Sequence, residues 1–465
     1  MTDRRRFFAR GARVLLLAGS LLLTACATRP DPALFPPIVF VHGNGDSGAL
    51  WQTTLWRFES NGWPTERLHA IDVPYPMARD EDPREQPGRT STAQHMAYLK
   101  AEVERVLNRS GADRAILVGN SRGGNAIRDY IQNGDGEQRI SHAILAGTPN
   151  HGIWSVKGMR ENNEFSGTGP FLTRLNTRKD ASGNEVTQAV RWLTLRSDNN
   201  DKYAQPDGVW IGSRGQPTNV SYSGPELVGA TNVVLPGADH RETAFSPAAF
   251  DAMYRFITGE APKTVEIVSL ESIVLNGTVT GLGLDPIDPA SGNFPNNLPV
   301  PGARVQVYAI DPETGQRIGE AAHDRTVGRN GRWGPFDARA GVAYEFAISA
   351  PGYPVNHVYR SGFPRSSGLV HLRLQRRVAT DEDARAIVTM TRPRGYFDVR
   401  RDKMSFGGIS PPPGLPARGA GLSVSKLKAT GDTVQTVVAE FNGERVVGRT
   451  WPGADDHLVF LELTY

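Results

Sequence analysis

One serine in this 465-residue chain stands in a setting that suits nucleophilic chemistry. The stretch AILVGNSRGGNAIRDYI places Ser121 between an apolar run and residues that can enter a helix. A serine on a sharp turn from strand to helix projects its hydroxyl above the sheet, provided that small neighbours let the strained turn pack. Gly119, Gly123 and Gly124 provide that space, and the helix start favours a developing negative charge. The pattern therefore predicts Ser121 as a nucleophile.

A histidine must reach this serine, because a hydroxyl attacks poorly until a base removes its proton. Among the ten histidines, only His240 closely follows a late strand, in VVLPGADHRETAFSP. A loop there can carry the imidazole back over the serine. We expect His42 to shape a nearby loop, and we assign His69 and His142 to strands. His240 is therefore the predicted general base.

The base in turn needs a carboxylate that fixes its tautomer and stabilises its charged form. The segment WLTLRSDNNDKYAQPDG begins with a predicted strand and lies between the serine and the histidine in the chain. It contains three candidates for this acid, Asp198, Asp201 and Asp207.

An acyl-transfer site also needs two N–H donors that face the oxyanion. The backbone N–H of Arg122, directly after the nucleophile, is the first. The second should come from the glycine-rich loop after the first strand, VFVHGNGDSGALW. This loop lacks the Lys-Ser/Thr ending of a P-loop and fails as a dinucleotide fingerprint. We expect no cofactor, and the sequence shows no cluster of metal ligands.

The elements that must position these residues alternate between short apolar runs and helix-like stretches from Pro36 to about Pro262. This is the pattern of a parallel sheet covered by helices. The predicted strands are Ile38–Val41, Leu68–Val73, Ala115–Val118, His142–Leu145, Trp192–Leu195 and Asn232–Leu235.

Two of the helices have clear end signals. An amphipathic helix is predicted over Thr92–Leu107, with Thr90 or Ser91 as its N-cap. A second helix is predicted after Ser246-Pro247, ending at Gly259.

Five motifs occur in one order between Phe40 and Pro247: FVHGNG, GNSRGG, AGTPNHG, SDNNDKYAQP and GADHRETAFSP. Together they resemble the bacterial and archaeal lipases of the α/β-hydrolase fold, in which serine, acid and histidine follow in this order. The resemblance implies hydrolysis of carboxylic esters through an acyl-enzyme. It favours Asp201, since Asp201 to Pro206 reproduces the Asp-x-x-x-x-Pro form of several lipases. It also makes Asn44 the second oxyanion donor.

Three points stay open in this half. Asp198 remains an alternative acid. Arg122 stands where lipases commonly have an apolar residue or glutamine, and we expect its side chain to affect substrate preference more than activity. The segment ENNEFSGTGPFLTRLNTRKDASGNEV is a predicted cap whose apolar side chains either line an acyl tunnel or form the core side of one helix. These side chains are Phe165, Phe171, Leu172 and Leu175.

After Pro262 apolar and polar residues alternate with period two, as in β-strands. The sequence NGTVTG…PGARVQVYAIDPETG…GRNGRWG…YEFAISAPGY resembles the prealbumin-like or carboxypeptidase-regulatory-like modules found beside many secreted enzymes, so we predict a β-sandwich over 263–377. Residues 378–465 add a hairpin at Asn442-Gly443 and a closing strand. They form either a separate β domain or the completion of the preceding one. The whole layout resembles archaeal lipases with a C-terminal β-barrel domain.

The start of the chain, MTDRRRFFARGARVLLLAGSLLLTAC, has a basic beginning, a short apolar run and a small-residue exit. It resembles a twin-arginine export signal that ends in the lipobox of bacterial lipoproteins. We predict a signal peptide over 1–25, lipidation of Cys26, a linker over 26–35 and a catalytic domain over 36–262. Export and lipid anchoring to the bacterial cell envelope would follow. In the alternative, Cys26 is incidental and the signal is cleaved elsewhere.

Charge and composition exclude a nucleic-acid partner. The formal net charge of +3 falls to −1 without residues 1–25, which leaves no basic patch. We expect an ester or lipid substrate and a membrane partner through Cys26, while the oligomeric state is undetermined. Two alternative functions remain: a depolymerase of a polyester such as polyhydroxyalkanoate, and a surface-binding lipoprotein without catalytic activity.

Overall fold

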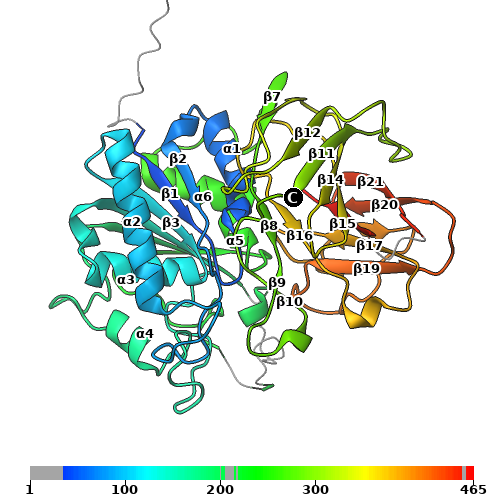
Figure 1. Ribbon diagram of the computed structural model, residues 1–465. Helices are drawn as coiled ribbons and strands as arrows, with labels where there is room; N and C mark the ends of the chain where they lie inside the picture. The colour runs from blue at the N-terminus through cyan, green and yellow to red at the C-terminus, as the bar shows by residue number, and fades with distance from the viewer. Residues whose placement is uncertain (1–34, 199, 205–213, 216–217, 453–456) are drawn as a thin grey trace, which may run out of the picture.

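The computed structural model describes residues 35–198, 200–204, 214–215, 218–452 and 457–465. The predicted signal peptide, Cys26, most of the linker and the candidate acid Asp207 lie outside these ranges. Figure 1 shows two halves side by side, one with a sheet and helices and one rich in β-strands. Within the described ranges, no helix is long and apolar enough to cross a membrane.

The first half contains a six-stranded sheet in the order β2-β1-β3-β4-β5-β6, and every neighbouring pair is parallel. Its strands are β1 (Ile38–Val41), β2 (Leu68–Ile71), β3 (Ala115–Asn120), β4 (Ile140–Ala146), β5 (Arg191–Ser197) and β6 (Thr231–Leu235). Each overlaps one predicted strand, so the predicted parallel α/β fold is confirmed.

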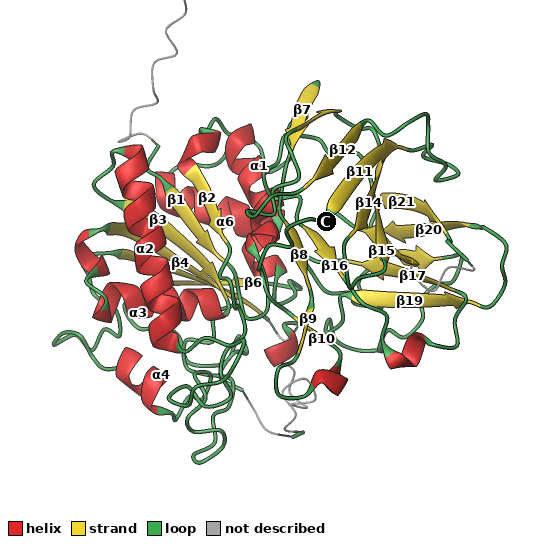
Figure 2. Cartoon of the chain, in the orientation of Figure 1, coloured by secondary structure: helices red, strands yellow, loops and turns green. Residues whose placement is uncertain are grey.

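Helices cover both faces of this sheet, which explains why its strands are continuous apolar runs (Figure 2). They are α1 (Gln52–Ser60), α2 (Thr92–Ser110), α3 (Arg122–Asn133), α5 (Glu242–Phe245) and α6 (Pro247–Thr258). In β1, Ile38 and Phe40 join the core formed with α1, α5 and α6. Val39 and Val41 point the other way, into the core formed with α2 and α3.

The helix ends follow the signals in the sequence. At the start of α2, Ser91 Oγ accepts from the Gln94 N–H, and the Gln94 side chain accepts from the Ser91 N–H. Ser91 is therefore the N-cap. Ser246 caps α6, and Gly259 ends that helix with a φ of 79°.

The second half is built around a seven-stranded sheet in the order β12-β11-β14-β15-β22-β17-β19. Its strands are β11 (Arg304–Ala309), β12 (His323–Thr326), β14 (Tyr344–Ser349), β15 (Val355–Arg360), β17 (Ala386–Thr391), β19 (Val424–Ala429) and β22 (His457–Glu462). Strand β22 pairs in parallel with both β15 and β17. Residues 378–465 therefore complete the sheet that residues 263–377 begin.

Smaller sheets cover both faces of the seven-stranded sheet. They contain β7 (Ser272–Leu275) with β13 (Phe336–Arg339), β8 (Val279–Gly281) with β16 (Leu372–Leu374), and β18 (Met404–Phe406), β20 (Thr436–Phe441) and β21 (Glu444–Arg449). In β22, Leu458 and Phe460 pack into one core and Val459 and Leu461 into another. This half thus has three β layers, where the predicted sandwich has two.

Two short pieces complete the β half. Strands β9 (Gly283–Leu284) and β10 (Asn293–Phe294) pair with each other. The predicted hairpin turn joins β20 to β21, with a φ of 47° at Asn442 and 94° at Gly443. Both left-handed residues suit a tight two-residue turn.

The two halves share a core. Trp56 of α1 is 1% exposed and packs with the β half. Its indole N–H donates to the Ser366 carbonyl oxygen at 2.8 Å, and its ring meets Phe363 edge-on at 6.5 Å between centroids. On the same helix, Glu59 pairs with Arg365 at 3.0 Å. The β half is therefore packed directly against the first half.

Candidate active site

Ser121 lies on the turn between β3 and α3, as its sequence context predicts. It has a φ of 53° and a ψ of −121°, a conformation that side-chain-bearing residues rarely adopt outside strained functional turns. The turn depends on its glycines: a Cβ on Gly123 would lie 2.5 Å from the Val41 carbonyl oxygen, and one on Gly119 would lie 2.7 Å from the Gly124 nitrogen. The chain can make this turn only with small residues there.

His240 and Asp201 come together from two separate loops. His240 Nδ1 lies 2.7 Å from Asp201 Oδ2, and both side chains are buried. Tyr203 presents its ring to the imidazole at 4.6 Å between centroids and an interplanar angle of 81°. The His240 carbonyl oxygen accepts from Asn120 Nδ2 at 3.2 Å, so the histidine loop is joined to the residue before Ser121.

The three candidate acids have different surroundings. Asp201 Oδ2 faces His240, and its Oδ1 accepts from the Tyr203 N–H at 2.8 Å. Asp198 instead holds backbone: its oxygens accept from the Asn200 and Gly237 N–H groups, both at 2.9 Å. Asp207 lies outside the described residues. Of the two described candidates, Asp201 has the geometry of an acid that orients the histidine.

The loop after β1 is held against Ser121. A Cβ on Gly43 would lie 3.0 Å from Ser121 Cβ, and Asn44 Oδ1 accepts from the Ala78 N–H at 2.7 Å. His42 Nε2 accepts from the Val73 N–H at 3.1 Å, and burial lowers the pKa of His42. A neutral His42 therefore stabilises this loop by its hydrogen bonds to the backbone.

The backbone N–H of Arg122 is at the first position of α3, where helix geometry offers it no intrahelical acceptor. It lies beside Ser121 at the positive end of the helix dipole, which suits it to bind an oxyanion. The second predicted donor, Asn44, belongs to the braced loop after β1.

The side chain of Arg122 does not behave as expected. It is 1% exposed, and its Nε and Nη2 donate to the two Glu164 oxygens, each at 2.8 Å. The remaining hydrogens go to the Pro76 carbonyl oxygen and to the Thr90 carbonyl and hydroxyl oxygens. All five N–H groups are thus engaged, so the side chain has no donor left for a substrate. Its role is to tie α3 to two loops over the site.

The predicted cap contains α4 (Pro170–Leu175). Phe171, Leu172 and Leu175 of this helix form a small cluster of their own. Phe165 belongs to a different cluster, which includes Trp154 and borders Tyr203 beside the histidine. The four side chains therefore do not line one tunnel. For the three on α4, the alternative of a helix core face fits.

The sequence did not reveal the contacts that the β half makes with the loop of His240. The acids on either side of His240, Asp239 and Glu242, bind Arg392 across the boundary between the halves. These residues are about 150 positions apart in the chain, and no local motif links them.

Among the described residues, no group of three or more histidine, cysteine or acidic side chains is arranged to hold a metal ion. The residues that gather at this edge of the sheet are instead a serine, a histidine, a carboxylate and backbone N–H groups. This set suits nucleophilic acyl transfer assisted by a general base.

Two family models match separate parts of the chain. A model described as the alpha/beta hydrolase fold matches residues 36–205, and a model described as the lipase C-terminal domain matches residues 271–377. The first half is thus an α/β-hydrolase fold, and the β half contains a segment that matches the C-terminal domain of lipases.

Similar solved structures include two forms of a Bacillus licheniformis lipase. The mature form is 21% identical over 49% of this chain and 91% of its own, with a TM-score of 0.34. The propeptide form is 15% identical over 91% of this chain and 93% of its own, with a TM-score of 0.37. A monoacylglycerol lipase of Paleococcus ferrophilus is 14% identical over 48% of this chain and 92% of its own, with a TM-score of 0.32.

Proposed function

We propose that this α/β hydrolase cleaves carboxylic esters by a serine mechanism. Ser121 is the nucleophile, His240 the general base, and Asp201 the acid that orients His240. The observation that carries the proposal is the 2.7 Å hydrogen bond between His240 and Asp201, at the same sheet edge as the strained turn of Ser121. The lipase C-terminal match over 271–377 supports an ester substrate.

The reaction follows from the roles of these groups. His240 Nε2 takes the proton of Ser121 as the hydroxyl oxygen attacks the ester carbonyl, and Asp201 stabilises the imidazolium through Nδ1–H. The N–H groups of Asn44 and Arg122 bind the oxyanion. His240 then protonates the leaving alcohol, which leaves an acyl-enzyme on Ser121. A water molecule activated by His240 releases the acid and restores the serine.

The substrate class within this proposal is an acyl ester of a lipid. The family resemblance of the motifs and the lipase C-terminal match support it. Export and anchoring to the bacterial cell envelope through a lipidated Cys26 belong to the same proposal, supported by the basic start, apolar run and lipobox of the first 26 residues. An enzyme held at a membrane surface would meet such esters there.

Replacement of Ser121 tests the mechanism. We expect Ser121→Ala to lower kcat on p-nitrophenyl butyrate by at least about 10,000-fold, because the nucleophile is gone. Labelling by a fluorophosphonate probe should disappear with it. The matched control is Ser223→Ala, at an exposed serine, which should keep both. Wild-type chain that resists the probe, or a Ser121→Ala chain that still hydrolyses the ester, would contradict the proposal. A series from butyrate to palmitate then defines the acyl preference.

A further inference from the structure

The loop that carries His240 is held from outside its own domain. Residues 236–241 join β6 to α5, and the two acids beside the histidine, Asp239 and Glu242, face the β half. Asp239 has no exposed surface. Its Oδ1 accepts from the N–H groups of Arg241 and Glu242, which shapes the local turn. Its Oδ2 accepts from Arg392 at 2.8 Å and from the Tyr396 N–H at 2.7 Å.

Hydrogen bonds hold both the backbone and the side chain of Arg392. It directly follows β17, its backbone N–H donates to the Ser423 carbonyl oxygen, and its Nε donates to the carbonyl oxygen of Tyr465. Its Nη2 reaches Glu242 at 2.6 Å, and its side chain is only 4% exposed. The guanidinium therefore connects the framework of the β half to both acids that flank His240.

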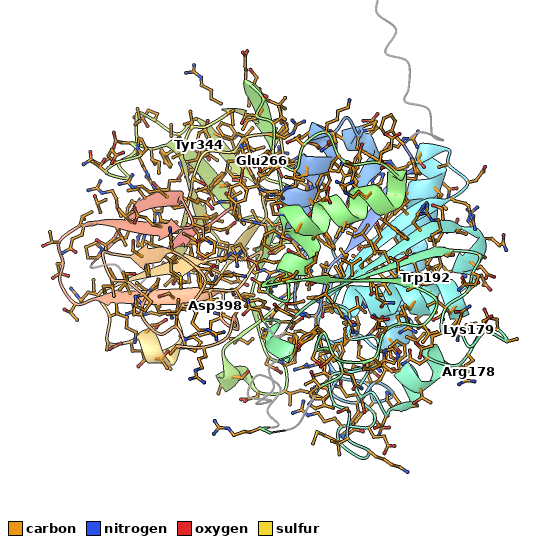
Figure 3. All side chains as sticks on the ribbon, turned by 180° about the vertical axis from the view of Figure 1, so that it is seen from behind. Arg178, Lys179, Trp192, Glu266, Tyr344 and Asp398 are labelled. Carbon is orange, nitrogen blue, oxygen red and sulfur yellow. The ribbon has the colours of Figure 1, made fainter. Side chains whose placement is uncertain are left out.

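Arg401 adds a second attachment. Its Nη1 donates to the Gly237 carbonyl oxygen at 2.7 Å and also to Glu242, while its Nε donates to Asp402 at 2.8 Å. The turn that carries it begins at Asp398, which Figure 3 labels on the β half near the boundary. Arg392, bound to Asp239 and Glu242, and Arg401, bound to Glu242, are together called the arginine clamp below.

The segment of the β half that contains Arg392 and Arg401 also contacts the other loops of the site. The ring of Tyr396 lies 4.9 Å from the guanidinium of Arg241 and 4.4 Å from the ammonium of Lys202. Arg241, next to His240, pairs with Asp46 of the loop after β1 at 2.9 Å. Lys202 is next to Asp201. One tyrosine of the β half thus contacts the segments that carry the base and the acid.

We propose that the β half positions His240 for catalysis through the arginine clamp. This inference rests on the proposed function, since it takes His240 as the general base. Arg392 and Arg401 are positioning residues, because they act through Asp239 and Glu242 and not on the substrate.

Two physical reasons favour positioning over mere adhesion between the halves. A buried ion pair is a poor source of net stability, because desolvation offsets most of its attraction, but charge-assisted hydrogen bonds hold a fixed geometry. The histidine needs such a geometry: it must stay bonded to Asp201 while it exchanges a proton with Ser121. A misplacement of about 1 Å can cost about 100-fold in rate.

The full chain with Arg392→Met tests the clamp against a matched control. The control is Arg365→Met, which removes a largely buried pair with Glu59 at the same boundary but away from His240. We expect Arg392→Met to lower kcat on p-nitrophenyl butyrate by about 30- to 100-fold with KM changed less than about twofold. Arg365→Met should keep kcat within about twofold while lowering the thermal midpoint.

A conservative variant and a spectroscopic signal separate positioning from general damage. Arg392→Lys keeps the charge but not the planar fork, so about a tenth to a half of the wild-type kcat should return. The Nδ1–H proton of His240, bonded to Asp201, should give a downfield proton resonance. It should broaden or vanish in Arg392→Met and persist in Arg365→Met. If Arg392→Met does not fold, Arg401→Met carries the same expectation with a fall of about three- to tenfold.

Three results would overturn the proposal. They are a folded Arg392→Met chain with wild-type kcat and resonance, a folded Arg401→Met chain with both unchanged when Arg392→Met cannot be made, and an equal loss of kcat in Arg365→Met. A failure of the proposed function is distinct: Ser121→Ala would then keep its activity. The His240 resonance would still report whether the clamp holds the histidine.

Discussion

Two buried arginines hold different parts of the candidate site in different ways. Arg122, beside Ser121, forms a two-bond pair with Glu164 inside the hydrolase half. Arg392 binds Asp239 and Glu242 beside the histidine, and it comes from the β half. Both guanidinium groups are almost completely buried. They differ in whether the anchor belongs to the same domain as the group it holds.

This difference divides the site into a self-contained side and a dependent side. The serine is fixed by a strand, a turn and a helix that are contiguous in the chain, and Arg122 reinforces them from within the same half. In the histidine loop, Asp239 Oδ1 accepts from a backbone N–H of the loop itself, whereas its Oδ2 accepts from Arg392 of the β half. Loss of the β half should therefore disturb the histidine far more than the serine.

On the dependent side, the largest effect is expected from Asp201, which is hydrogen-bonded to His240. Asp201→Asn should lower kcat by about 10,000-fold, because an amide cannot stabilise the imidazolium or hold the required tautomer. Asp198→Asn should keep kcat within about tenfold, since Asp198 binds the backbone of Asn200 and Gly237. Steady-state kinetics on p-nitrophenyl butyrate compares them. A larger loss in Asp198→Asn would make Asp198 the acid.

On the self-contained side, loss of Arg122 should lower the folding stability of the chain. Arg122→Met leaves Glu164 buried without its partner, and we expect it to lower the free energy of unfolding by about 3–5 kcal/mol. The double variant Arg122→Met with Glu164→Leu should recover part of this loss, because no uncompensated charge remains. Urea unfolding measures both. An altered acyl-chain preference in a fully stable Arg122→Met chain would contradict the structural role.

The smallest effect is expected in how the folding stability of the hydrolase half depends on pH. Burial, with Arg191 nearby, lowers the pKa of His142 in β4 to about 4, and burial with Arg105 nearby does the same for His69 in β2. The unfolded chain binds protons at these groups near pH 6.5, whereas the folded chain does so only near pH 4. Stability of the hydrolase half should therefore fall as the pH drops from 6.5 to 4.

His142→Gln tests this pH dependence. A full proton of difference equals about 1.4 kcal/mol per pH unit, and partial exposure of His142 reduces this to about 1 kcal/mol per pH unit or less. The variant should flatten the plot of unfolding free energy against pH between 4.5 and 6.5 by that amount. An unchanged slope would show that His142 keeps an ordinary pKa in the folded chain.

Sequence patterns were sufficient wherever a contiguous segment determines its own structure. The six strands of the first sheet, the turn at Ser121, and the ends of α2 and α6 lie at or close to their predicted positions. Each follows from apolar runs, capping side chains and glycines within a few residues. In the β half the hairpin at Asn442-Gly443 was predicted for the same reason.

The direction of single side chains was not predictable in the same way. Arg122 follows Ser121 in sequence, and its side chain was expected to affect substrate preference, but that side chain turns toward Glu164, 42 positions later. The choice between Asp198 and Asp201 depends on which carboxylate faces the imidazole, and both follow the same strand. Neither question has a local answer, because each depends on packing between distant loops.

By itself the sequence determined the alternation of strands and helices in the first half and the strand-to-helix turn that carries Ser121. These depend on local propensity, capping and steric limits of the backbone. Only the tertiary structure decided that β22 lies between β15 and β17, that Trp56 belongs to the core of the β half, and that Arg392 holds the acids beside His240. Those contacts join residues about 70 or more positions apart, and their energy exists only once distant segments have packed and excluded water.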